Sequence, residues 1–352
     1  MWIVTLLLFV LILGSIVLVH EFGHFIWAKI FKVHIYEFSI GMGPKIFSKK
    51  GKDKIDYSIR AFPIGGFVSM AGEVYADDDK VKKEDLMCNK PWYARTMILL
   101  AGVINNFILA LLLLFVYALI WGATPTEPIV GEVLENYPAA QAGLKAGDEI
   151  IKINGQKVSS WDAAQLVLVY KNNKGYTEFE VLREGGTTDI IKVSPIKEAD
   201  AETGEERMVF GFSVDTKIEK GFIPSLKFAF AKFGSVFDSM KLTIKGLFTG
   251  KISLNSLSGP VGIYQVVDQG AKLGISYIIY LIAFLSINVG FINVLPFPAF
   301  DGGRVLFIII EKIKGSPINA KIENAFHTIG FLLLMALMIY ITYRDILNLF
   351  IK

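Results

Sequence analysis

Residues 14–32 read GSIVLVHEFGHFIWAKIFK and place two histidines and a glutamate at the end of a long apolar segment. The uncharged residues 2–19 that lead into this stretch are nearly as long as a bilayer-crossing helix, which needs about 20 residues. An ionisable side chain inside a membrane helix costs about 2.5–3.5 kcal/mol or more unless it is paired or coordinated. His20, Glu21 and His24 together therefore indicate a functional site in the membrane.

The composition indicates a membrane protein. The 352 residues are 53% hydrophobic and the mean hydropathy is +0.49, which is well above the level of soluble domains. Lys and Arg number 36 against 33 for Asp and Glu, and this near balance predicts no nucleic-acid partner. Cys88 is the only cysteine, so an intrachain disulfide and a thiolate metal cluster are excluded.

Four segments without Asp, Glu, Lys or Arg are apolar enough to cross a bilayer: 2–19, 97–121, 273–300 and 325–343. The first lacks the basic start and the small-residue cleavage site of a secretory signal peptide, so we interpret it as a retained span. The apolar run 305–310 is too short to cross and predicts the buried start of a short helix.

The predicted domain order follows from these spans. It runs through a first span at 1–31, a cytoplasmic loop with a membrane-associated β-sheet at 32–95, a second span at 96–122, a β-rich external domain at 123–200, an amphipathic helical region at 201–272, a third span at 273–303, and a short cytoplasmic helix with the fourth span at 304–352.

Charge sets the predicted orientation of the spans. Residues 29–95 contain thirteen basic and nine acidic residues, and residues 304–321 contain four basic residues and one acidic residue. Basic loops stay in the cytoplasm, whereas residues 123–200 carry eight basic and twelve acidic residues and are expected outside. Both termini are then external, and the first and third spans run in the same direction.

Two loop regions have a sequence pattern of their own. Residues 35–70 contain short runs of β-forming residues separated by glycine turns, which favours a small sheet just inside the membrane, with an ordinary soluble meander as the alternative. In the external domain a helix is expected over 161–171. The phenylalanine-rich segment 225–248 predicts an amphipathic helix at the outer membrane surface or a helix packed on the external domain.

The spacing His-Glu-x-x-His predicts a zinc site. On a helix it puts His20 and His24 on one face, close enough to hold one Zn²⁺, and places Glu21 beside the metal as a general base. The alternative is an interfacial cluster whose histidines meet only headgroups and water. His34 lies among basic residues and His327 opens the fourth span, so neither is a good third ligand.

The end of the third span offers that ligand. Asp301 follows INVLPFPAF, at the depth that the predicted topology gives to the two histidines, although alone it could be a helix cap. Pro296 and Pro298 cannot continue a regular helix, and unwound backbone in a bilayer requires a buried or water-accessible cavity. Asn293 could donate its amide to a developing oxyanion.

These segments resemble the site-2 proteases, the intramembrane zinc metalloproteases of peptidase family M50, and within them the bacterial regulator of sigma-E protease branch. The resemblance runs nearly end to end and rests on HEFGHF (20–25), FSIGMGPKIF (38–47), PIGGFVSMAGE (63–73), AGVINNF (101–107), LSGPVGI (257–263) and NVLPFPAFDGG (293–303). Val103 stands where the family often has proline, and Phe300 stands where leucine is common.

The resemblance implies His20, His24 and Asp301 as ligands of one Zn²⁺, Glu21 as the general base and Asn293 as a catalytic contact. It also implies a membrane re-entrant β-hairpin around 57–72 and one extracytoplasmic PDZ module, where some relatives carry two. The expected substrate contacts are Gly65, Gly66, Phe67, Val68, Ser69, Pro296 and Pro298, and the expected PDZ peptide groove is Val130, Gly131, Glu132 and Val133.

The predicted fold is thus a polytopic α-helical membrane protein with four transmembrane helices, a re-entrant β-hairpin and one PDZ-like β domain. The predicted protein is a multi-pass enzyme of the bacterial cell membrane, with its active site near the cytoplasmic side. It would cleave single-pass membrane proteins in or near their transmembrane segments, such as anti-sigma factors or signal-peptide remnants. The alternatives are a non-catalytic PDZ scaffold and a zinc transporter; the intact Glu21 argues against the first, and the charge-free second and fourth spans argue against the second.

Overall fold

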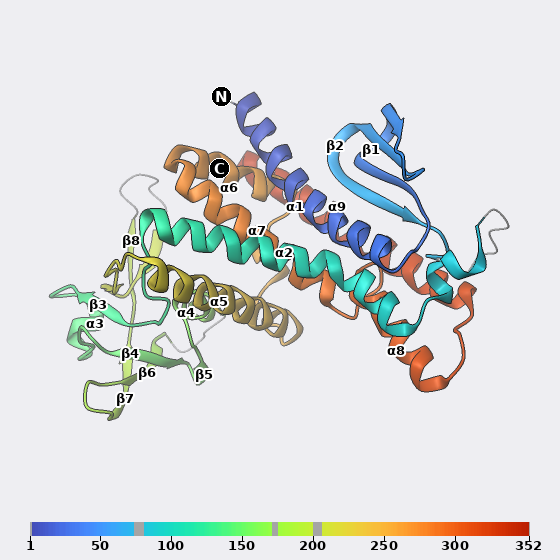
Figure 1. The fold of residues 1–352 in the computed structure, drawn as a ribbon. Coiled ribbons are helices and arrows are strands. Elements are labelled where there is room, and N and C mark those ends of the chain that lie inside the picture. Colours follow the sequence, from blue (N-terminus) through green and yellow to red (C-terminus); the bar gives the residue numbers. More distant parts are fainter. Residues whose placement is uncertain (1, 74–80, 171–174, 200–205, 352) are drawn as a thin grey trace. The chain divides into compact units, whose positions relative to one another are not determined.

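A computed structural model of the chain describes residues 2–73, 81–170, 175–199 and 206–351 (Figure 1). The chain forms two compact units. Unit 1 contains residues 1–113 and 257–352, and unit 2 contains residues 114–256. Each unit is described by itself below.

Four helices are long and apolar enough to cross a membrane, as the hydropathy pattern predicts. They are α1 (Trp2–Ile30), α2 (Trp92–Trp121), α7 (Ile275–Val294) and α9 (Ala320–Ile351). The third is shorter than the predicted 273–303, because Pro296 and Pro298 follow its last residue and cannot continue the hydrogen-bond ladder. The fourth begins before the predicted apolar segment and includes Lys321 and Glu323 in its first turns.

Helices α1 and α7 run parallel, as the predicted topology requires. Phe9, Ile12 and Ile16 of α1 form one apolar cluster with Ile278 and Leu281 in the first half of α7. The same cluster includes Val267 of α6 (Pro260–Leu273). The far ends of α1 and α7 therefore lie at one level, which is where the histidines and Asp301 occur.

The small sheet predicted within residues 35–70 is present as a long, strongly bent pair of strands, β1 (Ile35–Lys50) and β2 (Asp56–Met70) (Figure 1). Its predicted position just inside the membrane stays a prediction. Residues 35–40 pair antiparallel with 66–70 on one side, and residues 37–40 also pair with 56–59 on the other. Residues 45–50 pair with 56–60. Among the described residues, the segment 66–70 has a β-partner on one side only, which makes it an edge.

The remaining elements of unit 1 are short. Two 3₁₀ turns, η1 (Lys83–Asp85) and η2 (Met87–Asn89), precede α2, and α8 (Asp301–Lys314) follows α7. Phe307 and Ile308 of α8 are buried, so the predicted short helix after the third span is confirmed.

Unit 2 contains a β-rich domain and a long helix. Its elements after α2 are β3 (Val130–Val133), α3 (Pro138–Gln141), β4 (Glu149–Ile153), β5 (Gln156–Lys157), α4 (Trp161–Leu168), β6 (Thr177–Leu182), β7 (Thr188–Val193), β8 (Ile196–Ala199), β9 (Glu206–Val209), β10 (Phe212–Val214), α5 (Phe222–Phe248) and η3 (Leu254–Ser256). The main sheet has the order β5-β4-β6-β7, and β10 pairs with β3. One apolar core fills the domain, and Phe179 and Ile153 are fully buried in it.

Two predicted boundaries in unit 2 need correction. The β domain does not end at residue 200, because β10 returns to pair with β3 through Phe212–Val133 and Val214–Val130. Helix α4 ends at Leu168, and residue 171 of the predicted helix lies outside the described residues. Helix α5 packs on α4, where Lys232 Nζ contacts Asp162 at 2.7 Å, so the packed-helix interpretation of 225–248 is the one that the structure supports.

Candidate active site

Two histidines of α1 and an aspartate at the start of α8 meet in unit 1, although they are far apart in the sequence. His20 Nε2 lies 3.0 Å and His24 Nε2 lies 3.6 Å from Asp301 Oδ2, and the two Nε2 atoms are 3.2 Å apart. Both histidines are buried and Asp301 is largely buried. Two imidazole nitrogens and one carboxylate oxygen form a donor set of the type that holds a catalytic zinc with one position open.

Small residues let α2 approach this cluster. A Cβ on Gly102 would lie 2.7 Å from the Nε2 atoms of His20 and His24, and a Cβ on Gly23 of α1 would collide with the Ala101 carbonyl oxygen. Contacts below 3.0 Å are not tolerated by real side chains. Glycine at both positions is therefore required for α1 and α2 to pack this closely at the histidines.

Helix α2 also provides polar contacts to the Nδ1 atoms of His20 and His24, the ring nitrogens that do not face Asp301. His24 Nδ1 lies 2.8 Å from the Ile98 carbonyl oxygen, to which an Nδ1–H can donate. His20 Nδ1 lies 3.4 Å from Nδ2 of the fully buried Asn106. Sequence reasoning missed Ile98, Gly102 and Asn106 as parts of the site. Gly102 and Asn106 lie in AGVINNF (101–107), one of the segments on which the family resemblance rests, and that was the only signal for them.

Glu21 lies between the metal-ligand candidates and the edge strand. Its carboxylate belongs to the group His20, Glu21 and His24, whose ligand atoms all lie within 4.8 Å of one another. A Cβ on Gly66 would lie 3.8 Å from Glu21 Cγ. The start of the edge segment 66–70, at Gly66, therefore lies beside the predicted general base.

An irregular turn positions Asp301. After α7 the chain passes through Ala299, which has a positive φ of 73°, a conformation uncommon for non-glycine residues. The Ala299 N–H donates to His327 Nδ1 of α9 at 3.1 Å. Gly330 packs against the same turn, because an added Cβ would collide with Pro298 Cβ. Helix α9 thus supports the segment that carries Asp301.

Ion pairs connect this region to the sheet and to α2. Arg304 of α8 donates to Glu73, which follows β2, and Arg95 of α2 contacts Glu311 at 2.6 Å. Burial favours a lower pKa for Arg304, but the charges of Glu73 and Asp301 outweigh it and raise that pKa above its usual value. The charged state of Arg304 is therefore firmly held in the first turn of the helix that begins at Asp301.

The other predicted site residues lie in several places. Gly65 and Gly66, Val68 and the half-buried Phe67 and Ser69 are all in β2. Asn293 is half-buried in the last turn of α7, and Pro296 and Pro298 are in the turn before α8. No contact of Asn293 with the histidines or Asp301 is recorded among the described residues, so its catalytic role stays a prediction.

The predicted PDZ groove forms β3 of unit 2. Val130 is buried, and its backbone bonds to the loop before β4 as well as lying opposite β10. Glu132 N–H donates to Ser213 Oγ at 3.2 Å. Because both sides of β3 are already occupied near Val130, a peptide could add there only by displacing a neighbour, and the groove assignment stays a prediction.

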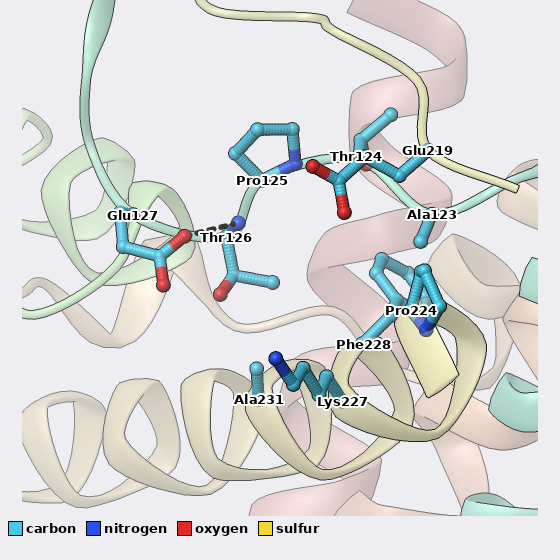
Figure 2. Close-up of a pocket in the computed structure, with 10 residues that line it drawn as sticks. All are labelled: Ala123, Thr124, Pro125, Thr126, Glu127, Glu219, Pro224, Lys227, Phe228 and Ala231. Atoms are coloured by element: carbon cyan, nitrogen blue, oxygen red, sulfur yellow. Dashed lines mark hydrogen bonds between the residues drawn. The ribbon is translucent and has the colours of Figure 1, made fainter.

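Unit 2 also contains a cavity of about 220 Å³ (Figure 2). It lies between the segment after α2 and the first turns of α5, with Pro125, Thr126 and Glu127 facing Pro224 and Lys227. Its ten lining residues include two carboxylates, Glu127 and Glu219, but no histidine or cysteine. The cavity therefore lacks the imidazole donors that His20 and His24 provide beside Asp301.

Comparisons with known proteins agree with this geometry. The sequence profile of peptidase family M50 matches residues 8–337. The regulator of sigma-W protease RasP of Bacillus subtilis is 34% identical, with 100% of both chains covered. Zinc metalloprotease RasP of Bacillus licheniformis is 32% identical over 99% of this chain and 100% of its own. A protein of Fusobacterium nucleatum whose name marks it as a candidate zinc metalloprotease is 38% identical over 98% of this chain and 99% of its own.

The family match covers nearly the whole chain, and these relatives are matched over almost their full length. The donor set of His20, His24 and Asp301 fits the zinc that the relatives' names imply. The chain belongs to peptidase family M50 and is an intramembrane zinc metalloprotease of the site-2 type, an enzyme of regulated intramembrane proteolysis.

Proposed function

We propose that His20, His24 and Asp301 hold the catalytic zinc and that Glu21 is the general base for hydrolysis of a peptide bond. The observation that carries this proposal is the convergence of three donor atoms from two distant segments beside a carboxylate and an edge strand. Zinc bound there would polarise the scissile carbonyl and make a water molecule easier to deprotonate.

Glu21 has the position for proton transfer. Its carboxylate is next to the two imidazoles and beside the backbone of Gly66. It would accept the proton of the attacking water and then deliver it to the leaving amine, a role that contributes about 10²–10⁴-fold to rate. Asn293, at the end of α7, is proposed to donate its amide to the developing oxyanion.

The edge strand 66–70 is the proposed binding site for an unwound substrate. A transmembrane helix has its carbonyls in internal hydrogen bonds and must open before it can be cleaved. Addition of an extended substrate segment to the unpaired edge would satisfy its backbone groups and present one carbonyl near Glu21. Residues 65–69, together with Pro296 and Pro298 of the turn before Asp301, would line this segment.

One close approach and the exposed apolar surface of the β1–β2 sheet support a membrane re-entrant position. The Pro63 carbonyl oxygen of β2 lies 3.3 Å from a Cβ placed on Gly14, in the middle of the α1 span. The sheet also exposes large apolar side chains, including Ile46 at 71% and Phe62 at 62%. Lipid contact would cover surfaces that are unfavourable in water.

The proposed orientation follows the distribution of charge. The basic loops would be cytoplasmic, and both termini and the β domain of unit 2 would be external. The site would then open near the cytoplasmic side of a bacterial cell membrane. We further propose that unit 2 contains a PDZ-like module that receives or excludes external segments of the substrate. A peptide bound at Val130, Gly131, Glu132 and Val133 of β3 would have to displace a strand or loop that now pairs with β3.

The proposed substrates are single-pass membrane proteins. The resemblance to the regulator-of-sigma-E protease branch, and the name of RasP as a regulator of sigma-W protease, favour anti-sigma factors or signal-peptide remnants. A substrate of this kind supplies one helix that can unwind at the strand edge.

The full chain in proteoliposomes with a single-pass reporter substrate tests the assignment. Glu21→Gln is expected to keep zinc, measured by elemental mass spectrometry, and to lower cleavage at least about 10²-fold. Asp301→Asn is expected to lower zinc content as well as cleavage. Glu84→Gln, at an exposed site, is the matched control and should match the parent. Undiminished cleavage by Glu21→Gln would refute the proposed base, and unchanged zinc in Asp301→Asn would refute the proposed ligand.

A further inference from the structure

Asn106 is a fully buried amide beside a candidate zinc ligand. Its Nδ2 lies 3.4 Å from His20 Nδ1. Among the described residues its Oδ1 is a buried atom without a hydrogen-bond partner. The nitrogen of a side-chain amide can only donate, so a hydrogen bond in this orientation requires a His20 whose Nδ1 is unprotonated.

The geometry of the metal-ligand candidates requires the other tautomer. His20 and His24 both direct Nε2 at Asp301, and a neutral imidazole that binds a metal through Nε2 carries its proton on Nδ1. His24 meets this requirement, because its Nδ1–H can donate to the Ile98 carbonyl at 2.8 Å. The Nδ1–H of His20 needs an acceptor in the same way.

Half a turn of the Asn106 amide about its Cβ–Cγ bond supplies that acceptor. The oxygen and nitrogen of an asparagine side chain are nearly the same in size, and their assignment follows from the hydrogen-bond network. In the turned orientation Oδ1 faces the Nδ1–H of His20 and no longer lacks a partner. The rotation gives the oxygen a donor and removes the unfavourable meeting of two donors at His20. Nδ2 then takes the buried position that Oδ1 occupied.

We propose that Asn106 is a positioning residue, an inference that rests on the proposed function. Its amide oxygen accepts from the Nδ1–H of His20 and so directs the Nε2 lone pair of His20 at the zinc. The Ile98 carbonyl oxygen accepts from the Nδ1–H of His24 in the same way and directs the Nε2 of His24 at the zinc. Ile98, Gly102 and Asn106 occur at intervals of four and so share one face of α2, with Gly102 providing the close approach. One helix face then fixes both imidazoles.

The backbone of Asn106 is itself anchored. Its carbonyl oxygen accepts from the buried Ser286 Oγ of α7 at 2.9 Å. This contact joins α2 to α7, and α7 leads into the turn that carries Asp301. The amide of Asn106 is therefore held at a fixed place relative to both segments that supply zinc ligands.

The test compares two substitutions of Asn106 in the full-length protein purified in detergent. Asn106→Leu keeps the approximate shape and removes the acceptor, whereas Asn106→Asp keeps an acceptor. Zinc affinity is measured by competition with a chromophoric chelator. We expect Asn106→Leu to bind zinc about 10–100-fold more weakly and Asn106→Asp to stay within about threefold of the parent, because a carboxylate accepts from a zinc-ligating histidine equally well.

Controls separate positioning from packing. Asn105→Leu makes the same change at the next residue, whose Nδ2 donates to the Val19 carbonyl at 3.3 Å, and should leave zinc affinity unchanged. Thermal unfolding of the metal-free variants reports packing, and it should be similar for Asn106→Leu and the parent. The absorption spectrum of the Co²⁺-substituted protein reports ligand geometry and should change in Asn106→Leu but not in Asn105→Leu.

The outcomes distinguish this inference from the proposed zinc ligands. If His20→Ala keeps full zinc affinity, the ligand assignment itself is wrong. If His20→Ala loses zinc while Asn106→Leu keeps it, the ligands stand and the role of Asn106 is refuted. Weaker zinc binding by Asn106→Asp than by Asn106→Leu would also refute it, because loss of an acceptor would then not be the cause.

Discussion

The two units differ in whether their buried polar side-chain atoms have hydrogen-bond partners. In unit 2 the buried Asp148 accepts from Arg183 at 2.8 Å and from the Lys145 N–H at 2.8 Å, and the described part of that unit contains no buried side-chain nitrogen or oxygen without a partner. In the described part of unit 1, the buried atoms without one include Thr96 Oγ1 and Asn288 Oδ1 as well as Asn106 Oδ1 and His327 Nε2. The last two belong to residues next to the candidate zinc site, since Asn106 contacts His20 and His327 accepts from the turn before Asp301.

This difference separates a unit built for stability from one built around a reaction. A buried polar atom without a partner costs about 1–3 kcal/mol, and such atoms are rare in proteins and tend to mark functional sites. In unit 1 the buried histidines and Asp301 form the donor set proposed for zinc, with Glu21 as the proposed base beside them. In unit 2 the buried Asp148 is balanced by a charge, and apolar packing provides the stability.

The largest expected effect concerns the core of unit 2. Phe179 is fully buried and makes edge contacts with Phe210 and Phe212 at ring distances of 5.4 and 5.8 Å. Phe179→Ala should destabilise the β domain by about 3–5 kcal/mol, because a large cavity replaces the ring. Hydrogen exchange of β6 and β7 measures this loss. Zinc content should stay unchanged. A loss of zinc would show that zinc binding in unit 1 depends on the stability of unit 2.

The second prediction compares a glycine-to-alanine substitution in each unit. In unit 1, Gly102→Ala places a Cβ 2.7 Å from the Nε2 atoms of His20 and His24, so these side chains must move. Zinc–ligand distances vary by only about 0.2 Å, so such a movement disturbs the site. Changes that disturb the surroundings of metal ligands typically cost about 10–100-fold in metal affinity, so a fall in zinc affinity of that order is expected in the chelator competition.

Gly234→Ala is the matched control in helix α5 of unit 2. A Cβ there meets no atom within 4 Å, and alanine favours a helix over glycine by about 0.8–1.0 kcal/mol. Slightly higher thermal stability with unchanged zinc is expected. Equal zinc affinity in both variants would contradict the close packing of α2 on the histidines.

The smallest effect is expected on the outer support of Asp301. Gly330→Ala would bring a Cβ into collision with Pro298 and push α9 away from the turn at Ala299. This change leaves Asp301, the proposed ligand, unaltered but loosens the turn that holds it. Zinc should therefore dissociate about tenfold faster, at the low end of the effect of residues that support a metal ligand. Stopped-flow transfer of zinc to a chelator measures the rate. An unchanged rate would mean that α9 does not hold this turn.

Much of the fold was accessible from the sequence because it depends on local patterns. Long uncharged runs predict the four spans, and Pro296 and Pro298 predict where the third helix ends. The limit of the β domain was not accessible, since the pairing of β10 with β3 joins segments that are far apart in the sequence. The packing of α5 on α4 was also open, because an amphipathic face does not reveal what covers it.

The sequence by itself determined the chemistry of the site, since His20, Glu21 and His24 are so close in the chain that helical geometry alone puts the two histidines on one face. Tertiary structure decided what surrounds them. Asn106 and Gly102 reach the histidines only because α2 packs against α1, and His327 and Gly330 reach the turn before Asp301 only because α9 packs against it. Contacts of this kind depend on how whole helices pack, and no local pattern in the sequence encodes that.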